Sequence, residues 1–184
     1  MRKLSHEEIV SRQVNQSRTI RVPIVVVLDN IRSLHNVGAI FRTADGIGIE
    51  KIFLCGITGY PPQSDIAKTA LGAEESVVWE YRQDVIEVVK ELKLKGFQIV
   101  VLEQAEGAVS YEDFEPQGPV ALVVGNEVDG VNEGAISLCD QTIEIVMRGI
   151  KNSLNVAVAF GVVGFCFRQK LDTLRLNVIS PREL

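Results

Sequence analysis

The sequence predicts an α/β fold, with a mainly parallel sheet and helices on both faces. Short apolar runs that suit buried strands alternate with amphipathic helical patterns along the chain. The clearest unit runs from Pro119 to Arg168 and reads as strand, glycine loop, helix, strand, loop, helix. At 184 residues, 46% of them hydrophobic, the chain fits one domain with a full core.

In the first half of the chain, the elements follow from caps and from the spacing of apolar residues. Ser5 and Glu8 fit a capping box. An apolar face recurs from Val37 to Ala44 at helical spacing, and Gly46 and Gly48 end that helix. The expected elements are a helix over 7–15, strands over 24–28 and 51–55, a helix from 37, one or two helical turns over 65–71 and a short strand over 76–81.

In the second half, Asp84 begins an amphipathic helix that Gly96 ends. The further elements expected are strands over 97–102, 120–124 and 142–147, an acidic loop over 103–118 and a last helix over 153–171. The tail from Asp172 has no strong signal. The last two strands both open into loops rich in Gly and Asn, and we treat them as neighbours that form a ligand crevice.

Composition limits the function classes. No apolar run could span a membrane and the first residues lack a secretory h-region, so we expect a cytoplasmic protein. The three cysteines fit reduced thiols, and with two distant histidines no metal site is expected. The net charge of −5 opposes strong non-specific RNA binding, although the Lys and Arg residues gather near the two ends of the chain and leave 96–147 without any.

Several common site motifs are absent. There is no Walker A motif and no Gly-x-Ser-x-Gly elbow. Gly46-Ile47-Gly48 follows a helix and lacks the third glycine of a dinucleotide fingerprint. A cofactor held mainly by the backbone of glycine loops remains open.

Three segments together resemble the SpoU (TrmH-type) family of RNA 2′-O-ribose methyltransferases, in the SPOUT superfamily. They are Leu28–Asn30 with Asn36–Ala44, then Val123–Glu127 with Gly130, then Ser153–Ala159. Ala70–Glu74 is also typical of the family. The likeness covers about Pro23 to Arg168, so we divide the chain into a short helical extension, 1–22, and a methyltransferase domain, 23–184.

The resemblance implies a fold and a partner that periodicity would not suggest. The family's catalytic domain has a deep C-terminal trefoil knot, whereas general topology rules argue against knots. Family members are generally homodimers, with groups contributed to the substrate site across the interface. The implied reaction moves a methyl group from S-adenosyl-L-methionine to a ribose 2′-hydroxyl and leaves S-adenosyl-L-homocysteine.

The motif match gives Arg42 the central catalytic role. Its high pKa favours a charged guanidinium that stabilises the developing alkoxide and grips a phosphate, rather than a general base. Without the motif, a salt bridge to Asp45 is the simpler expectation. Asn36 either positions the ribose or caps a helix, and Glu127 either orients Arg42 or Asn36 or is a solvated turn residue.

The remaining site residues follow from the same match. Ser153 and Asn155 are expected to touch the substrate, to cap the last helix, or to do both. Cofactor-lining positions are Leu102, Glu103, Gly125, Ile145, Met147, Ser153 and Leu154, and the alternative for them is ordinary core and turn. RNA contacts are assigned to Arg42, Lys68, Arg148 and Lys151.

The leading hypothesis is an S-adenosylmethionine-dependent RNA 2′-O-ribose methyltransferase acting on tRNA. An rRNA substrate is the second choice, since the chain has no room for the added RNA-binding domain of many rRNA-directed relatives. A non-catalytic RNA-binding module and a small-molecule-binding α/β regulator are the other classes. Methyl transfer and RNA affinity separate them.

Overall fold

The structure is a computed structural model that describes residues 2–5, 7–9, 11–12 and 21–179, with side chains to residue 174. Seven strands form one sheet in the order β3-β2-β1-β6-β4-β7-β5, and every pair in it is parallel. The strands are β1 Val22–Asp29, β2 Ile49–Cys55, β3 Trp79–Arg82, β4 Gln98–Leu102, β5 Val109–Ser110, β6 Val120–Gly125 and β7 Gln141–Glu144. The predicted parallel sheet is confirmed.

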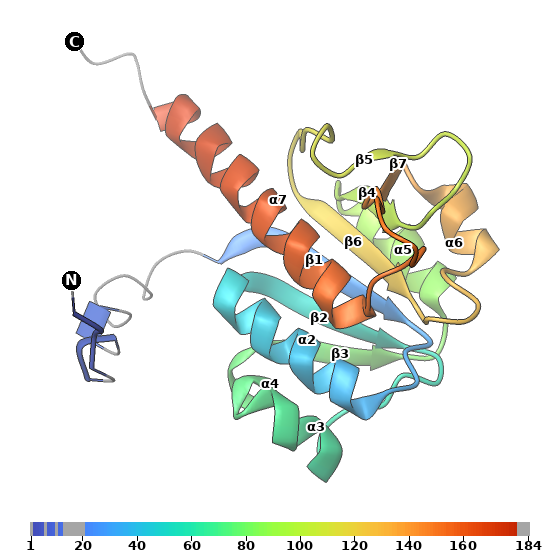
Figure 1. The fold of residues 1–184 in the computed structure, drawn as a ribbon. Helices are drawn as coiled ribbons and strands as arrows, with labels where there is room; N and C mark the ends of the chain where they lie inside the picture. Colours follow the sequence, from blue (N-terminus) through green and yellow to red (C-terminus); the bar gives the residue numbers. More distant parts are fainter. Residues whose placement is uncertain (1, 6, 10, 13–20, 180–184) are drawn as a thin grey trace.

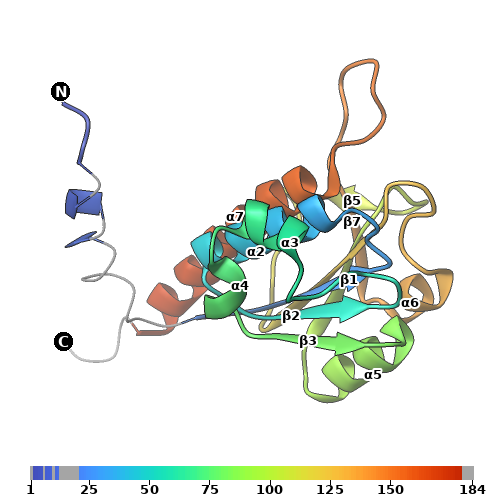
Figure 2. The same cartoon turned by 90° about the horizontal axis from the view of Figure 1, so that it is seen from below.

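Helices cover both faces of this sheet, as predicted (Figures 1 and 2). They are α2 Leu34–Ile47, α3 Ser64–Ala70, α4 Ala73–Ser76, α5 Val85–Leu94, α6 Glu133–Leu138 and α7 Val156–Ile179. The side of α2 and α7 is the larger core, with Phe41, Phe160 and Phe167 fully buried. On the other side α5 and α6 pack on alternate residues of the same strands, such as Val25 and Val27. Within the described residues no helix is long and apolar enough to cross a membrane.

The predicted adjacency of the last two long strands is wrong. β4 lies between β6 and β7, with Val101 paired to Val123 on one side and to Thr142 on the other. The last strand is also shorter than predicted and ends at Glu144 rather than Met147. Its last pair with β4 is Leu102–Ile143, so beyond this point β7 has no neighbour on that side and the chain leaves the sheet.

Two helices differ from their predicted bounds. α2 begins at Leu34 rather than Val37, because the Ser33 Oγ accepts a hydrogen bond from the Asn36 N–H at 3.3 Å and caps it. α7 runs to Ile179, past the predicted end at Leu171. An Arg168–Asp172 ion pair of 2.6 Å supports that added length.

Smaller elements were missed or displaced. The single turn α4 and the two-residue β5 have too few residues for a periodic pattern, and the predicted strand over 76–81 is displaced to β3. The Ser5–Glu8 capping box is confirmed by reciprocal bonds of 2.8 and 3.2 Å. Residues 7–9 and 11–12 are helical, while 10 and 13–15 of the predicted helix lie outside the described residues.

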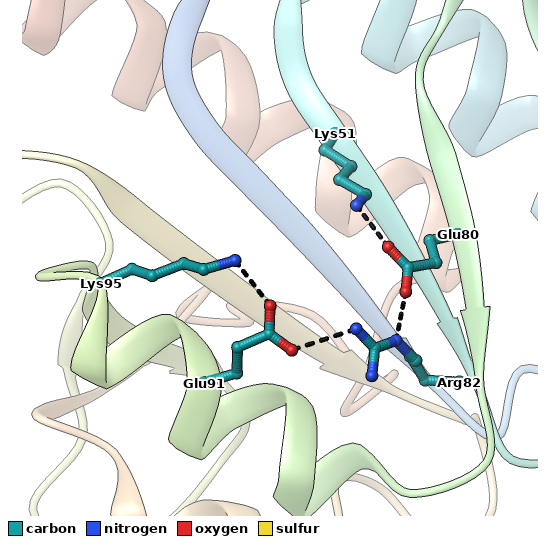
Figure 3. Close-up of polar contacts among 5 residues, drawn as sticks. All are labelled: Lys51, Glu80, Arg82, Glu91 and Lys95. Atoms are coloured by element: carbon teal, nitrogen blue, oxygen red, sulfur yellow. Dashed lines mark hydrogen bonds and ion pairs between the residues drawn. The ribbon is translucent and has the colours of Figure 1, made fainter.

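An ion-pair network ties the β3 edge of the sheet to α5 (Figure 3). The Glu80 carboxylate lies 2.5 Å from the Lys51 Nζ and also accepts from Arg82. Arg82 reaches Glu91 at 3.1 Å, and Glu91 in turn pairs with Lys95 at 2.6 Å. These partners hold the pKa values of Glu80 and Glu91 below the ordinary range, chiefly through the hydrogen bonds from Lys51 and Lys95 respectively.

The segment between β7 and α7 returns across the loops that follow β4 and β6. The Gln104 Nε2, just after β4, donates to the Asn152 carbonyl at 2.5 Å. From there α7 runs back along the face of the sheet that α2 also covers (Figures 1 and 2). This path of the C-terminal third is consistent with the predicted trefoil knot.

Candidate active site

The carboxyl ends of the parallel strands meet at one edge of the sheet, where loops gather around a cavity of about 450 Å³. The loops follow β4, β6 and β7, and the start of α7 closes the remaining side. This volume is typical of a cavity for a nucleoside-sized ligand. It lies where open α/β sheets bind ligands, at the carboxyl ends of the strands.

Every residue predicted to line the cofactor site lies in the wall of this cavity. They are Leu102, Glu103, Gly125, Ile145, Met147, Ser153 and Leu154. Further lining residues, not predicted as cofactor contacts, include Gln104, Val124, Asn126, Glu144, Asn152 and Ala159. Position after a strand end could have indicated Gln104 and Asn126. Ala159 lies in the Ser153–Ala159 motif segment, whereas nothing in the local sequence singles out Asn152.

The loop after β6 turns so tightly that only glycine fits at its start. A Cβ at Gly125 would lie 2.2 Å from the carbonyl carbon of Gly130. The Gly130 N–H donates to the Asn126 carbonyl at 3.1 Å and closes the turn. Inside the turn, the buried Asn126 Oδ1 accepts from the N–H groups of Val128 and Asp129, both at 2.9 Å. The turn therefore presents its backbone to the cavity in one fixed shape.

The Glu103 carboxylate joins two walls of the cavity. One oxygen accepts from the Val131 N–H at 3.1 Å and the other from the Gln104 N–H at 2.9 Å. Together with the Gln104–Asn152 bond, this connects the loops after β4, β6 and β7. Glu103 keeps unused lone pairs beside the cavity, where they could accept hydrogen bonds from ligand hydroxyl groups.

Three predicted catalytic residues form a hydrogen-bonded chain across three elements. The Asn36 Nδ2 on α2 donates to Glu127 after β6, and the Asn36 Oδ1 accepts from the Asn155 Nδ2 at 2.9 Å. The Asn155 Oδ1 also accepts from the Ala157 N–H at 2.9 Å and so caps α7. Asn155 therefore caps α7, one of its two predicted roles, and it also contacts the site residue Asn36, while its contact with the substrate stays a prediction. Asn36 is not a helix N-cap, since Ser33 has that role.

Arg42 lies outside this group. It is exposed on α2 and is not among the residues that line the cavity. The salt bridge to Asp45 considered from the sequence is not made, because the Asp45 carboxylate instead accepts from the Ser76 hydroxyl at 2.7 Å. Within the described part of the chain, Arg42 has no hydrogen bond or ion pair, and Glu127 contacts Asn36 rather than Arg42.

The other predicted RNA contacts are spread over two surfaces. Lys68 is exposed on α3 and pairs with Asp65 at 2.7 Å. Arg148 and Lys151 are exposed on the segment between β7 and α7, beside the cavity but outside its wall. Among the described side chains, no group of three or more His, Cys, Asp or Glu residues could hold a metal ion.

A buried carboxylate near the site was not predicted. Asp29, the last residue of β1, is 1% exposed and accepts from the Asn132 N–H at 2.7 Å and the Asn30 Nδ2 at 2.8 Å. Burial raises the pKa of Asp29 because water no longer solvates its charge. Its bond to Asn132 fixes the far end of the loop that follows β6.

The arrangement suits a flat, polar ligand with an apolar side. Leu102, Ile145 and Leu154 offer apolar contacts, while loop backbone and the Glu103 carboxylate offer hydrogen bonds. These features fit S-adenosylmethionine, because its adenine, ribose and methionine parts together require apolar contacts, backbone hydrogen bonds and a carboxylate acceptor. Glu127 and Asn155 lie in the cavity wall, and Asn36 joins them from outside it.

Comparison with known proteins agrees with this geometry. Over 162 residues the chain is 33% identical to a tRNA (guanosine(18)-2′-O)-methyltransferase of Thermus thermophilus, covering 87% of this chain and 82% of that protein. The crystal structure of the A. aeolicus TrmH/SpoU tRNA modifying enzyme matches with a TM-score of 0.79 at 26% identity, over 92% of this chain and 88% of that one.

A second solved structure contains the expected ligand. The AdoMet-bound rRNA methyltransferase from Sinorhizobium meliloti matches with a TM-score of 0.75 at 28% identity, over 79% of this chain and 56% of that one. Finally, the model of the SpoU rRNA Methylase family matches residues 23–165, most of the sheet, the whole cavity wall and the start of α7. The chain therefore belongs to the SpoU methylase family.

Proposed function

We propose that this protein is an S-adenosylmethionine-dependent RNA 2′-O-ribose methyltransferase that acts on tRNA. The observation that carries the proposal is the cavity, which has all the predicted cofactor positions in its wall, together with Glu127 and Asn155 of the Glu127–Asn36–Asn155 chain. A tRNA substrate is favoured because the Thermus thermophilus relative, which matches most of this chain, is a tRNA methyltransferase. An rRNA substrate is the second candidate, because the Sinorhizobium meliloti protein is an rRNA methyltransferase.

The cofactor would be held mainly by backbone and apolar contacts. Gly125, Ile145 and Leu154 would flank and bond the adenine, and Glu103 would accept from the ribose hydroxyls. When bound, S-adenosylmethionine supplies a methyl group that its sulfonium already makes electrophilic. The protein's own residues therefore have to align the attacking 2′-hydroxyl and stabilise the charge that develops on its oxygen.

Asn36, Asn155 and Ser153 are the proposed positioning groups for the ribose. Glu127 and the α7 cap restrict the two amides to one orientation, so the ribose meets a fixed pattern of donors and acceptors. A fixed pattern aligns the hydroxyl for in-line attack without further rearrangement.

Arg42 is the proposed electrostatic catalyst, acting in the site of a second copy of the chain. It is exposed and outside the cavity of its own chain, so it needs a partner to reach a reacting oxygen. The neighbouring helix α7 exposes Val158, Val162 and Phe165 at helical spacing, by 52%, 36% and 53%. An exposed apolar stripe of this kind favours a homodimer in which α7 and α2 lie in the interface.

The RNA would then contact Lys68, Arg148 and Lys151 around the site. The N-terminal residues would form a helical extension before the methyltransferase domain, for which we predicted the boundary at 22/23, although Val22 already pairs with Ile49 at the start of β1. The proposed tRNA substrate implies a cytoplasmic location.

Isothermal titration with S-adenosylhomocysteine tests the cofactor site. We expect micromolar binding that Gly125→Ala abolishes, because the added Cβ would displace the turn at Gly130. Gly118→Ala is the matched control, since a Cβ there meets nothing within 4 Å. If the folded wild-type protein does not bind S-adenosylhomocysteine, the methyltransferase proposal is refuted and the non-catalytic RNA-binding module becomes the preferred function.

Methyl transfer to unmodified tRNA and rRNA transcripts tests the reaction. Arg42→Ala should lose turnover and keep cofactor affinity. Arg42→Lys should recover little of the turnover, because lysine lacks the planar fork of donors that arginine has. Wild-type turnover in Arg42→Ala would refute the assigned role.

A further inference from the structure

The chain that joins β7 to α7, residues 145–155, forms one side of the candidate active site. We call it the β7–α7 segment. In Figure 2 it projects from the body of the molecule beside the start of α7. It contributes six residues to the cavity wall: Ile145, Met147, Asn152, Ser153, Leu154 and Asn155. The shape of the cavity therefore depends on where this segment lies.

Few contacts hold the β7–α7 segment in place. Its residues from 148 to 155 are all exposed, Ile150 completely, and a Cβ on Gly149 would meet nothing within 4 Å. Asn155 is anchored at the start of α7, but within the described part of the chain residues 145–154 make one hydrogen bond to the rest of the protein. In this bond the Gln104 Nε2 donates to the Asn152 carbonyl at 2.5 Å. A segment with so few contacts opens at a small cost in free energy.

Gln104, by contrast, stands on a rigid support. It comes shortly after β4, which is paired with a strand on each side. Its own N–H donates to the Glu103 carboxylate at 2.9 Å, and the other oxygen of that carboxylate accepts from the Val131 N–H at 3.1 Å. The side-chain amide of Gln104 therefore connects a fixed edge of the sheet to the weakly held Asn152.

We propose that Gln104 is a positioning residue for the cofactor, because its hydrogen bond to Asn152 keeps the β7–α7 segment closed against the cavity. The inference rests on the proposed function, which supplies S-adenosylmethionine as the ligand. Only the closed segment presents Met147, Ser153 and Leu154 to that ligand, so the apparent affinity is proportional to the closed fraction of the protein. One exposed hydrogen bond is also weak enough to break each time the product leaves.

Three variants isolate this bond. Gln104→Met keeps the length of the side chain and removes the donor, whereas Gln104→Lys keeps a donor with enough reach for the same carbonyl. Gln117→Met is the matched control. The Gln117 Nε2 also donates to a backbone carbonyl, that of Glu115 at 3.1 Å, in the same connection between β4 and β6, but Gln117 lies outside the cavity wall.

Proteolysis measures the closed fraction without any ligand. A protease specific for arginine cuts after Arg148, which is exposed in the segment, and the cleavage rate follows the population of the open form when opening is fast. We expect cleavage after Arg148 to be about two- to tenfold faster in Gln104→Met. Gln104→Lys and Gln117→Met should be cut at the wild-type rate, and the melting temperature should be the same in all four proteins.

Binding of S-adenosylhomocysteine measures the consequence for the cofactor. Isothermal titration should give a Kd about two- to tenfold higher in Gln104→Met and close to the wild-type value in Gln104→Lys and Gln117→Met. In methyl-transfer assays, KM for S-adenosylmethionine should rise by a similar factor in Gln104→Met with little change in kcat. The reason for this split is that the bond affects binding and does not touch the reacting atoms.

Each other outcome overturns the proposal. Weaker binding in Gln104→Met with an unchanged cleavage rate would mean that Gln104 contacts the ligand directly and does not act through the segment. Faster cleavage with an unchanged Kd would mean that the position of the segment has no effect on the cofactor. If the wild type binds no S-adenosylhomocysteine, the proposed function fails, and the cleavage rates, which need no ligand, still show whether Gln104 holds the segment closed.

Discussion

Asn155 has two separable roles, and a pair of substitutions distinguishes them. Its Oδ1 caps α7 at the Ala157 N–H, while its Nδ2 donates to Asn36. Asn155→Ala removes both contacts, about 1 kcal/mol for the cap and about 0.5 kcal/mol for an exposed side-chain bond. For a domain of this size, that sum lowers the melting temperature by about 3 to 6 °C.

Asn155→Asp keeps the cap and replaces the donor with a carboxylate oxygen, which faces the Asn36 Oδ1 without a hydrogen bond. Aspartate is as good an N-cap as asparagine and its charge is favourable at a helix start, so the melting temperature should fall by less than about 2 °C. Asn36 nevertheless loses the partner of its Oδ1 and the fixed orientation of its amide. We expect both variants to lose about tenfold or more in kcat, although only the alanine variant is clearly less stable.

Scanning calorimetry and methyl transfer from labelled S-adenosylmethionine measure the two effects on the same preparations. The reasoning is refuted if Asn155→Asp loses as much stability as Asn155→Ala, since the cap would then not be the stabilising contact. It is equally refuted if Asn155→Asp keeps wild-type kcat, because Asn36 would then not depend on this bond for its orientation.

Three further predictions concern assembly, packing and pH. Mixing Arg42→Ala with Gly125→Ala subunits should recover about a quarter of wild-type turnover, since half of the dimers are mixed and each has one complete site; a mixture without activity contradicts sharing of Arg42 between subunits. Gly38→Ala should destabilise by about 1 to 3 kcal/mol, because its Cβ would lie 2.3 Å from the Ile66 carbonyl, whereas Gly46→Ala on the same helix, 3.7 Å from Phe165, should not. Glu80→Gln should lower the free energy of unfolding by less than about 1 kcal/mol at pH 7. Because the pKa of Glu80 is depressed in the folded protein, its contribution is present above the unfolded pKa and is lost as pH falls through the folded pKa, so the two proteins should converge at acidic pH in urea titrations.

The elements of the fold could be predicted because their signals are local. Apolar runs and stop signals gave most strands and helices, as at Gly96 and in the Ser5–Glu8 capping box. The order of the strands is not a local property, and it was here that prediction failed. Nothing within 120–147 indicates that β4, formed earlier in the chain, lies between β6 and β7.

The candidate site shows the same division. Motif residues such as Gly125 and Leu154 lie in the cavity wall, and their contact with a cofactor stays a prediction. The Gln104–Asn152 bond joins residues far apart in sequence, so spacing could not reveal it. For Arg42, the motif indicated importance and gave no position, and the structure places it on the surface rather than in its own cavity.

The non-local sheet also determines when the chain can become competent to bind. Ile24 in the central strand β1 pairs with Val120 of β6, almost a hundred residues later in the chain. β1 therefore cannot pair with its second neighbour until most of the chain has folded around it. Such topologies fold slowly, and the apolar faces of β1 remain open to aggregation until β6 arrives. The bonds from Glu103 to Val131 and from Gln104 to Asn152 close later still, since they need the residues that follow β6 and β7. Ligand affinity is thus a property of the finished molecule alone, and a ligand at high concentration would select finished chains from incomplete ones by mass action.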